Sequence, residues 1–349
     1  MRPFTSLTAI LVSLGLTASL SAQTVATDPV GFTTLTVNAK PASIRGFTLL
    51  SLNLTRLPVF QSVVPTVSTN GSNQTVLTFP ASTFTAGAFN AAANGGSHYI
   101  ELLNGANSGR ISDIVSNTDS TITLADNITS SLTAGSSTIK IRPNWTFGTV
   151  FGANNSAGLL GGVSASAADV VSLTNPSTGV ATNYFYSTTN NRWQTGLTDA
   201  TNHVIPADVG LRIERKLTSP VSFQIVGAVK LGTTGIFIQG GSAKNLNYVA
   251  NPYPLPSVTL ANSNLYTGNP ATGLAGGVSA SAADNLSIYD SATGVYTNYF
   301  YSTTNNRWQK GLADASNDVI PDGAAVLITR KNNGSSFIWY VPQPTMNLN

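Results

Sequence analysis

The fold is decided by a stretch that occurs twice, TNYFYSTTNNRWQ at Thr182–Gln194 and again at Thr297–Gln309. The match extends over Gly158–Lys216 and Gly273–Lys331 at a constant offset of 115 residues, with 39 of 59 positions identical by direct count. Alternating aromatic and polar residues followed by Thr-Thr-Asn-Asn are typical of a strand, a tight turn and a returning strand. The chain therefore contains an internal duplication of a β-meander.

The repeat continues outside this block at a different offset. Ser51–Pro58 corresponds to Val249–Pro256 at an offset of 198, and the difference from 115 places 83 additional residues inside the first unit. The sequence predicts an all-β protein with two homologous β-sandwich or barrel-like units in tandem and a small β-barrel-like module inserted in the first. The predicted divisions are a signal peptide at 1–22, unit one at 23–60 and 146–223, the inserted module at 61–145, and unit two at 224–349.

The inserted module has short β-forming runs separated by Gly, Asn, Ser and Asp. They are TVLTFP (75–80), HYIELL (98–103), RISDIVS (110–116), STITLA (120–125) and STIKIRP (137–143). Five short strands at this spacing favour a small barrel or sandwich.

The N-terminal segment is typical of a secretory signal. Arg2 supplies a positive charge, Leu7–Leu20 an apolar core, and Leu20-Ser-Ala22 a small-residue cleavage site before Gln23. The apolar run is shorter than the roughly 20 residues that a membrane-spanning helix needs, so we expect no stable membrane span after cleavage. We expect export to the periplasm, the cell surface or the extracellular space.

The composition excludes several classes of function. The chain has no cysteine, which rules out disulfides, thiolate metal sites and thiol catalysis. Lys and Arg number 17 against 14 Asp and Glu, and they are scattered, so we expect no nucleic-acid partner. The sequence also lacks HExxH, GxSxG, Walker and GxGxxG motifs. We therefore expect a protein that is not an enzyme.

The repeated aromatic residues are the feature most like a binding surface. Sugars stack on flat aromatic rings while Asn and Arg bind their hydroxyl groups, so this composition suits carbohydrate. The alternative is cross-strand aromatic pairing that holds the sheet together. In both units the tyrosines share one strand face, and we expect Phe185 and Phe300, on the other face, to point to the core. The candidate carbohydrate residues are Tyr184, Tyr186, Asn191, Arg192, Trp193, Tyr299, Tyr301, Asn306, Arg307 and Trp308.

A group of acidic and amide residues near the end of unit two is a weak candidate Ca²⁺ site, the one cofactor that the sequence suggests. It consists of Asp314, Asn317, Asp318 and Asp322, and unit one has Asp208 one position late for Asp322. Oxygen-rich loops can bind Ca²⁺, but Asp and Asn also dominate ordinary turns. A hydrolase that uses these aspartates is a further alternative.

The first predicted strand of the mature chain is a candidate for self-assembly. Val30, Phe32, Leu35 and Val37 lie on a strand that only a short N-terminal segment precedes. Such a strand can pair with the open edge of a neighbouring molecule.

Four segments together resemble a known family. They are TDPVGFTTL (27–35), IRPNWTFGTV (141–150), NPYP (251–254) and the Val-Ile-Pro…Arg-Lys ends of the two units. The family is an uncharacterised group of exported β-rich bacterial proteins that occur as many paralogues per genome. The resemblance implies a signal peptide, two related β units and an inserted β module, and it supplies no ligand and no catalytic residue.

These observations favour an exported, non-enzymatic structural or cell-surface protein that acts through β surfaces in a matrix, coat or filament. Its expected partners are further copies of itself or other surface and matrix proteins. The alternatives are an extracellular carbohydrate-binding module, with polysaccharide as its partner, and an aspartate-based hydrolase.

Overall fold

The computed structural model describes residues 28–41, 46–92, 95–241, 245–253, 258–331 and 334–343. The predicted signal peptide, 1–22, lies outside the described residues. The protein is all-β, as predicted: besides the short helix α1 (Phe147–Phe151) and the 3-10 turn η1 (Thr129–Ser131), the regular elements of the described chain are strands in antiparallel sheets. Among the described residues, no helix has the length and apolarity needed to cross a membrane.

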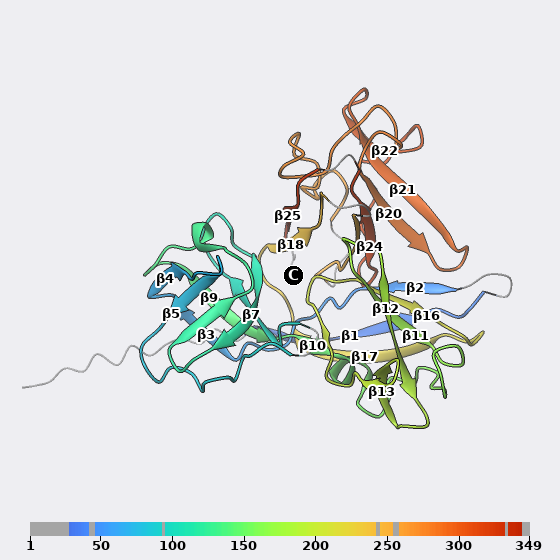
Figure 1. Cartoon of the computed structure of the whole chain (residues 1–349). Coiled ribbons are helices and arrows are strands. Elements are labelled where there is room, and N and C mark those ends of the chain that lie inside the picture. The colour runs from blue at the N-terminus through green and yellow to red at the C-terminus, as the bar shows by residue number, and fades with distance from the viewer. Residues whose placement is uncertain are drawn as a thin grey trace, which may run out of the picture.

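A seven-stranded sheet lies on the left of Figure 1 and contains the strands predicted for the inserted module. Phe60–Thr69 forms both of its end strands, because the run bends at Val64-Pro65; its first half pairs with β9 and its second half with β5. The sheet thus curls in a barrel-like way. The sequence did not predict β3 or β4. The strand order is β3 (Phe60–Val63), β9 (Thr138–Pro143), β6 (His98–Leu102), β7 (Ile111–Asn117), β8 (Thr121–Leu124), β5 (Thr75–Thr78) and β4 (Thr66–Thr69).

Two six-stranded sheets lie on the right of Figure 1, and their strands correspond one to one. The first large sheet has the order β14 (Thr198–Asp199), β13 (Arg192–Thr195), β12 (Ala181–Ser187), β11 (Val170–Thr174), β16 (Leu211–Glu214) and β2 (Phe47–Leu50). The second has the reverse listing: β19 (Leu246–Val249), β24 (Val326–Thr329), β20 (Asn285–Asp290), β21 (Val295–Ser302), β22 (Arg307–Lys310) and β23 (Ala313–Asp314).

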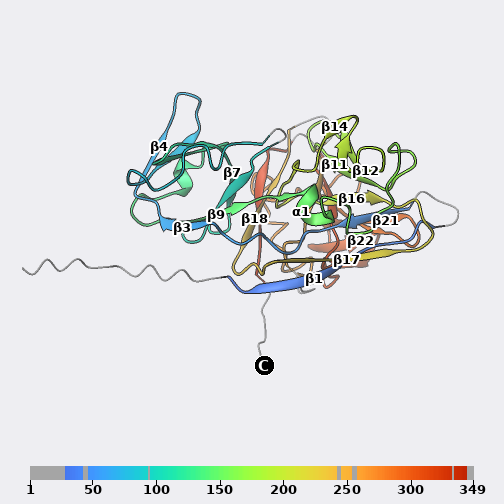
Figure 2. The same cartoon turned by 90° about the horizontal axis from the view of Figure 1, so that it is seen from below.

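Each large sheet is accompanied by a two-stranded ribbon. The first ribbon pairs β1 (Val30–Val37) with β17 (Val221–Ala228), and the second pairs β18 (Thr234–Ile238) with β25 (Phe337–Val341). A further short pair joins β10 (Trp145–Thr146) to β15 (Val204–Ile205). The predicted boundaries at 60/61, 145/146 and 223/224 all fall inside strands. Figure 2 shows β1 and β17 along the lower edge of the molecule.

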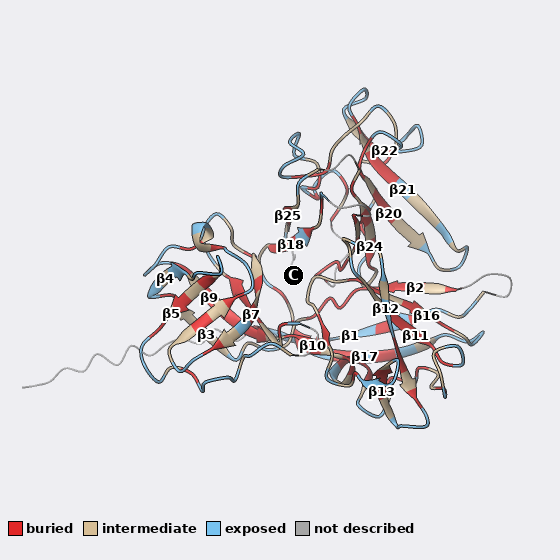
Figure 3. Ribbon diagram, viewed as in Figure 1, coloured by how far each residue is buried: buried red, intermediate tan, exposed pale blue. Residues whose placement is uncertain are grey.

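Three hydrophobic cores fill the molecule, one for each of these parts (Figure 3). The first core joins β1 and β17 to the first large sheet, through residues such as Leu35, Phe223 and Leu211. The second joins the β18–β25 ribbon to the second large sheet, through Ile236, Trp339 and Ile328. Each ribbon therefore covers one face of its sheet, and the third core lies within the seven-stranded sheet.

Backbone contacts hold the parts together. The inner edges of the two large sheets meet at the bridges Leu50↔Ala324 and Val209↔Val249. The loop before β7 contacts the β18–β25 ribbon, where the N–H of Gly235 donates to the carbonyl of Gly109. β14 and β23 are then the outer edges of the sheets; their neighbours β13 and β22 lie at the bottom and top of Figure 1.

Candidate functional site

The predicted carbohydrate platforms are wrong because both tryptophans belong to the cores. Trp193 is 0% exposed and Trp308 is 3% exposed. Helix α1 packs on the same face of the sheet, with ring centroids 5.2 Å apart between Phe151 and Trp193. The indole N–H of Trp193 donates to the carbonyl of Gly152 at 2.8 Å. A ring enclosed on both sides has no face for a sugar.

The assignment of strand faces is also reversed. Tyr184 and Tyr299 are buried members of the two cores, whereas Phe185 and Phe300 are buried on the opposite face, outside these clusters. The register explains this, because Tyr186 and Tyr301 lie directly opposite Trp193 and Trp308 and share their face. Tyr186 and Tyr301 are half-buried against the same cores.

The predicted Asn and Arg residues stabilise turns. Asn191 and Asn306 have φ values of 48° and 50°, the left-handed conformation that a tight turn requires. The guanidinium of Arg192 donates to the carbonyl of Leu197 at 3.1 Å, and Arg307 donates to the carbonyl of Leu312 at 3.5 Å. The contacts that the structure shows for these side chains are therefore structural.

The four residues of the candidate Ca²⁺ site do not form one site. Asp314 accepts from the backbone N–H of Ser316 at 2.9 Å, and Asp318 pairs with Lys310 at 3.3 Å. Asp322 lines a separate recess beside Tyr289 and Asn38, while Asn317 is exposed. Within the described ranges, no three acidic or histidine side chains are grouped as metal ligands. Turn chemistry explains these residues instead.

The predicted self-assembly strand is already paired within the chain. β1 pairs with β17 over its whole length, from Val30↔Ala228 to Val37↔Val221. Leu35 and Val37 are buried, but Val30 and Phe32 are exposed on the other face. The four residues therefore do not act together: two fill the core and two face solvent.

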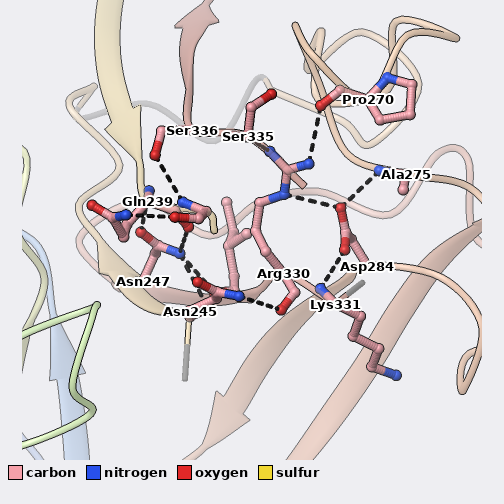
Figure 4. Close-up of polar contacts among 12 residues, drawn as sticks. Gln239, Asn245, Asn247, Pro270, Ala275, Asp284, Arg330, Lys331, Ser335 and Ser336 are labelled. Carbon is pink, nitrogen blue, oxygen red and sulfur yellow. Dashed lines mark hydrogen bonds and ion pairs between the residues drawn. The ribbon is translucent and has the colours of Figure 1, made fainter. Parts of the chain in front are cut away.

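The clustered basic residues noted in the sequence form two equivalent buried ion pairs. Arg330 lies 3.1 Å from Asp284, and both side chains are 0% exposed. Arg215 pairs with Asp169 in the same way. Figure 4 shows that the guanidinium of Arg330 also donates to the carbonyls of Ser335 and Pro270, at 2.6 and 3.0 Å. The backbone N–H groups of Ala275 and Lys331 donate to Asp284, at 2.8 and 2.6 Å.

A second buried ion cluster fixes the seven-stranded sheet to the rest of the molecule. Arg142 and Lys230 lie 2.7 and 2.8 Å from Glu101, while Lys140 and Arg142 both pair with Asp28. Burial alone would raise the pKa of Glu101, but the two cations outweigh burial and lower it to about 2. Asp28 precedes β1 and Lys230 follows β17, so the cluster joins three parts of the chain.

The best-formed cavity lies where these parts meet. It has a volume of about 370 Å³ and lies between the seven-stranded sheet, the loop at Pro206–Asp208 and the β18–β25 ribbon. The ribbon contributes an apolar wall that includes Phe237, 47% exposed, and Ile338. The opposite side carries Asp113, Asp126, Asp208, Arg110, Asn144 and Tyr99. We call this space the junction cavity.

The carboxylates of the junction cavity lack cation partners. None of Asp113, Asp126 and Asp208 forms an ion pair with a described residue. Asn144 donates to Asp113 at 3.3 Å, and Ser112 donates to Asp126 at 2.9 Å. Burial raises the pKa of Asp113 to about 6, and the neighbouring charges of Asp208 and Asp126 act in the same direction. Burial also raises the pKa of Asp208.

Replacing Asp113 with asparagine is expected to stabilise the protein at neutral pH. The folded-state pKa is about 6 against an ordinary 3.8, so the stability that Asp113 contributes is complete below about pH 4 and is lost as the pH rises through 6. An uncharged amide removes this loss and still accepts from Asn144. We expect a gain of about 1–3 kcal/mol at pH 7.5, measured by urea unfolding. An equal effect at pH 4 would contradict this origin.

Sequence reasoning missed the junction cavity. Its residues come from six separate segments, and the sequence singled out only Asp208, as the unit-one counterpart of Asp322.

The comparisons with known proteins place no relative beside this chain. No protein-family model, no curated protein and no solved structure matches it.

Proposed function

We propose that the protein is an exported, non-enzymatic structural protein of the cell surface or extracellular matrix that self-associates through its β surfaces. The observation that carries this proposal is the outer face of the β1–β17 ribbon. Phe32, Val226 and Val30 are 71%, 63% and 60% exposed there. The rest of this face consists of Thr34, Thr36, Ser222 and Gln224.

This face suits contact with a second copy of the chain. Neither β1 nor β17 contains a charged residue, so two such faces can approach without charge repulsion. Long, flat and uncharged strands are surfaces that soluble proteins normally protect against association. The exposed apolar residues Phe32 and Val226 are direct neighbours in the register, so they form one patch.

The second ribbon shows why the first remains open. Gly235 occupies the position of Phe32, as the pairs Phe32↔Val226 and Gly235↔Tyr340 indicate. A Cβ atom on Gly235 would lie only 3.2 Å from the Cα of Arg110 in the seven-stranded sheet's loop. The second ribbon thus admits this loop because it has glycine. Phe32 excludes an equivalent cover, which leaves the first ribbon free for a partner.

Phe32→Asp is expected to prevent self-association. A carboxylate at the centre of an apolar contact would have to lose its hydration, which costs several kcal/mol without a partner. The measurement is light scattering on a sizing column, with residues 23–349 at several concentrations. We expect the wild type to form assemblies and the variant to remain a monomer with an unchanged thermal midpoint.

Val295→Asp is the matched control. Val295 is 58% exposed on β21, away from the ribbon, and the same substitution there should leave the assemblies intact. A wild-type protein that is monomeric at every concentration contradicts the proposed self-association. Equal effects of the two substitutions would show that the ribbon is not the contact.

A further inference from the structure

We propose that the junction cavity binds an organic ammonium ion with an apolar body. The inference goes beyond the proposed structural function and does not depend on it. It rests on three features of the cavity: unpaired carboxylates, a buried hydroxyl group without a partner, and an apolar wall facing them.

The carboxylates differ from the other buried acidic residues of the described chain. Asp28, Glu101, Asp169 and Asp284 each have an Arg or Lys partner. Arg110 lines the cavity, but its guanidinium donates to Ser131 at 3.0 Å and forms no ion pair there. Asp208 accepts instead from the backbone N–H of Phe237. The negative charge that faces the cavity is therefore not neutralised by the described residues.

Tyr99 is an independent indication of a ligand. Its side chain lines the cavity and is 2% exposed, yet its hydroxyl group has no hydrogen-bond partner among the residues that the structure describes. A buried hydroxyl group without a partner costs about 1–3 kcal/mol. Burial raises the pKa of Tyr99, so the group stays a neutral donor and acceptor at physiological pH. A ligand with N–H groups would satisfy it.

The opposite wall defines the rest of the ligand. Phe237 and Ile338 present apolar surface from the β18–β25 ribbon. An aromatic ring also attracts a cation placed over its face. The cavity volume of about 370 Å³ accommodates a small ring that carries an ammonium group. The three carboxylates favour the cation over a neutral or anionic analogue of the same shape.

The test compares isosteric probes on residues 23–349 at pH 7.5. Benzylamine is a cation, benzyl alcohol is neutral and benzoate is an anion. Nα-acetyl-lysine methylamide, in place of benzylamine, reports whether an ammonium group on a peptide side chain also binds. Dissociation constants come from ligand-detected NMR. Because hydrogen bonds to charged groups contribute about 1.5–3 kcal/mol, we expect benzylamine to bind about tenfold or more tightly than benzyl alcohol.

Variants assign the binding to the cavity. Asp208→Asn and Asp113→Asn should each weaken benzylamine about tenfold and leave benzyl alcohol unchanged, because an amide keeps the local hydrogen bonds and removes the charge. Tyr99→Phe should weaken benzylamine without changing the charge. Asp119→Asn, on an exposed turn outside the cavity, is the matched control. Unchanged thermal midpoints above that of the wild type's unfolding onset verify the fold of each variant.

The pH dependence is a second readout. The groups that face Asp113 across the cavity are Asp126, Asp208, Tyr99 and Arg110. Lowering the pH from 7.5 to 5 protonates Asp113, whose pKa is about 6, and should weaken benzylamine but not benzyl alcohol. The proposal is overturned if benzyl alcohol binds as tightly as benzylamine, if the Asp variants bind like the wild type, or if no amine binds at all.

Discussion

Trp193→Ala and Trp308→Ala are each expected to lower the free energy of unfolding by about 3–5 kcal/mol, the usual cost of truncating a fully buried aromatic side chain. Trp193 contacts Phe147 and Phe151, with ring centroids 5.7 and 5.2 Å away. Removing the indole leaves a cavity between the sheet and helix α1. It also leaves the carbonyl of Gly152 without its donor. Urea unfolding of residues 23–349 measures the effect.

Leucine residues in the next turn provide the control. Leu197 and Leu312 are 84% and 89% exposed and lie four residues after the two tryptophans. Their replacement by alanine should change stability by no more than about 0.5 kcal/mol, because they have little surface to lose from a core. A tryptophan variant that unfolds like the wild type but loses retention on a glycan matrix would restore the carbohydrate hypothesis.

The tryptophans show how far period-2 patterns reach. The pattern in Thr182–Gln194 predicts the strands, the turn and the residues that share a face, and the structure confirms these features. It does not reveal which face is inside, because β12 carries aromatic residues on both. That choice is made by elements distant in the sequence, helix α1 and the β1–β17 ribbon, which cover the tyrosine and tryptophan face.

Pairings over long distances in the sequence limited the site predictions in the same way. The sequence contains the acidic ends of both AAD segments and the Arg-Lys ends of both units, but they lie 46 residues apart. No local spacing rule connects them. The junction cavity is a stronger case, since Tyr99, Asp126 and Phe237 come from different sheets and loops. Short motifs predicted the strands, whereas tertiary packing created the sites.

Arg330→Met is expected to destabilise the protein by about 3–5 kcal/mol, because it leaves a buried charge without its counter-ion. Asp284 would keep its two backbone donors, Ala275 and Lys331, but lose the guanidinium. The carbonyls of Ser335 and Pro270 would lose their donor as well (Figure 4). Methionine fills a similar length with apolar atoms, so the effect reports the charge and the hydrogen bonds more than the lost volume. Urea unfolding at pH 7 measures it.

Arg307→Met makes the same chemical change at an exposed pair and serves as the matched control. Arg307 lies 3.5 Å from Asp314, with side chains 39% and 52% exposed, so we expect a loss of no more than about 1 kcal/mol. Adding Asp284→Asn to Arg330→Met should recover part of the stability, because the amide oxygen still accepts from the backbone and the buried charge is gone. If Arg330→Met and Arg307→Met cost the same, or the double variant is less stable than Arg330→Met, the buried charge is not what makes this pair important. The equivalent pair Arg215 and Asp169 should then be tested with Arg215→Met, whose cost should follow that of Arg330→Met, since the duplication has placed the same ion pair at the end of both large sheets.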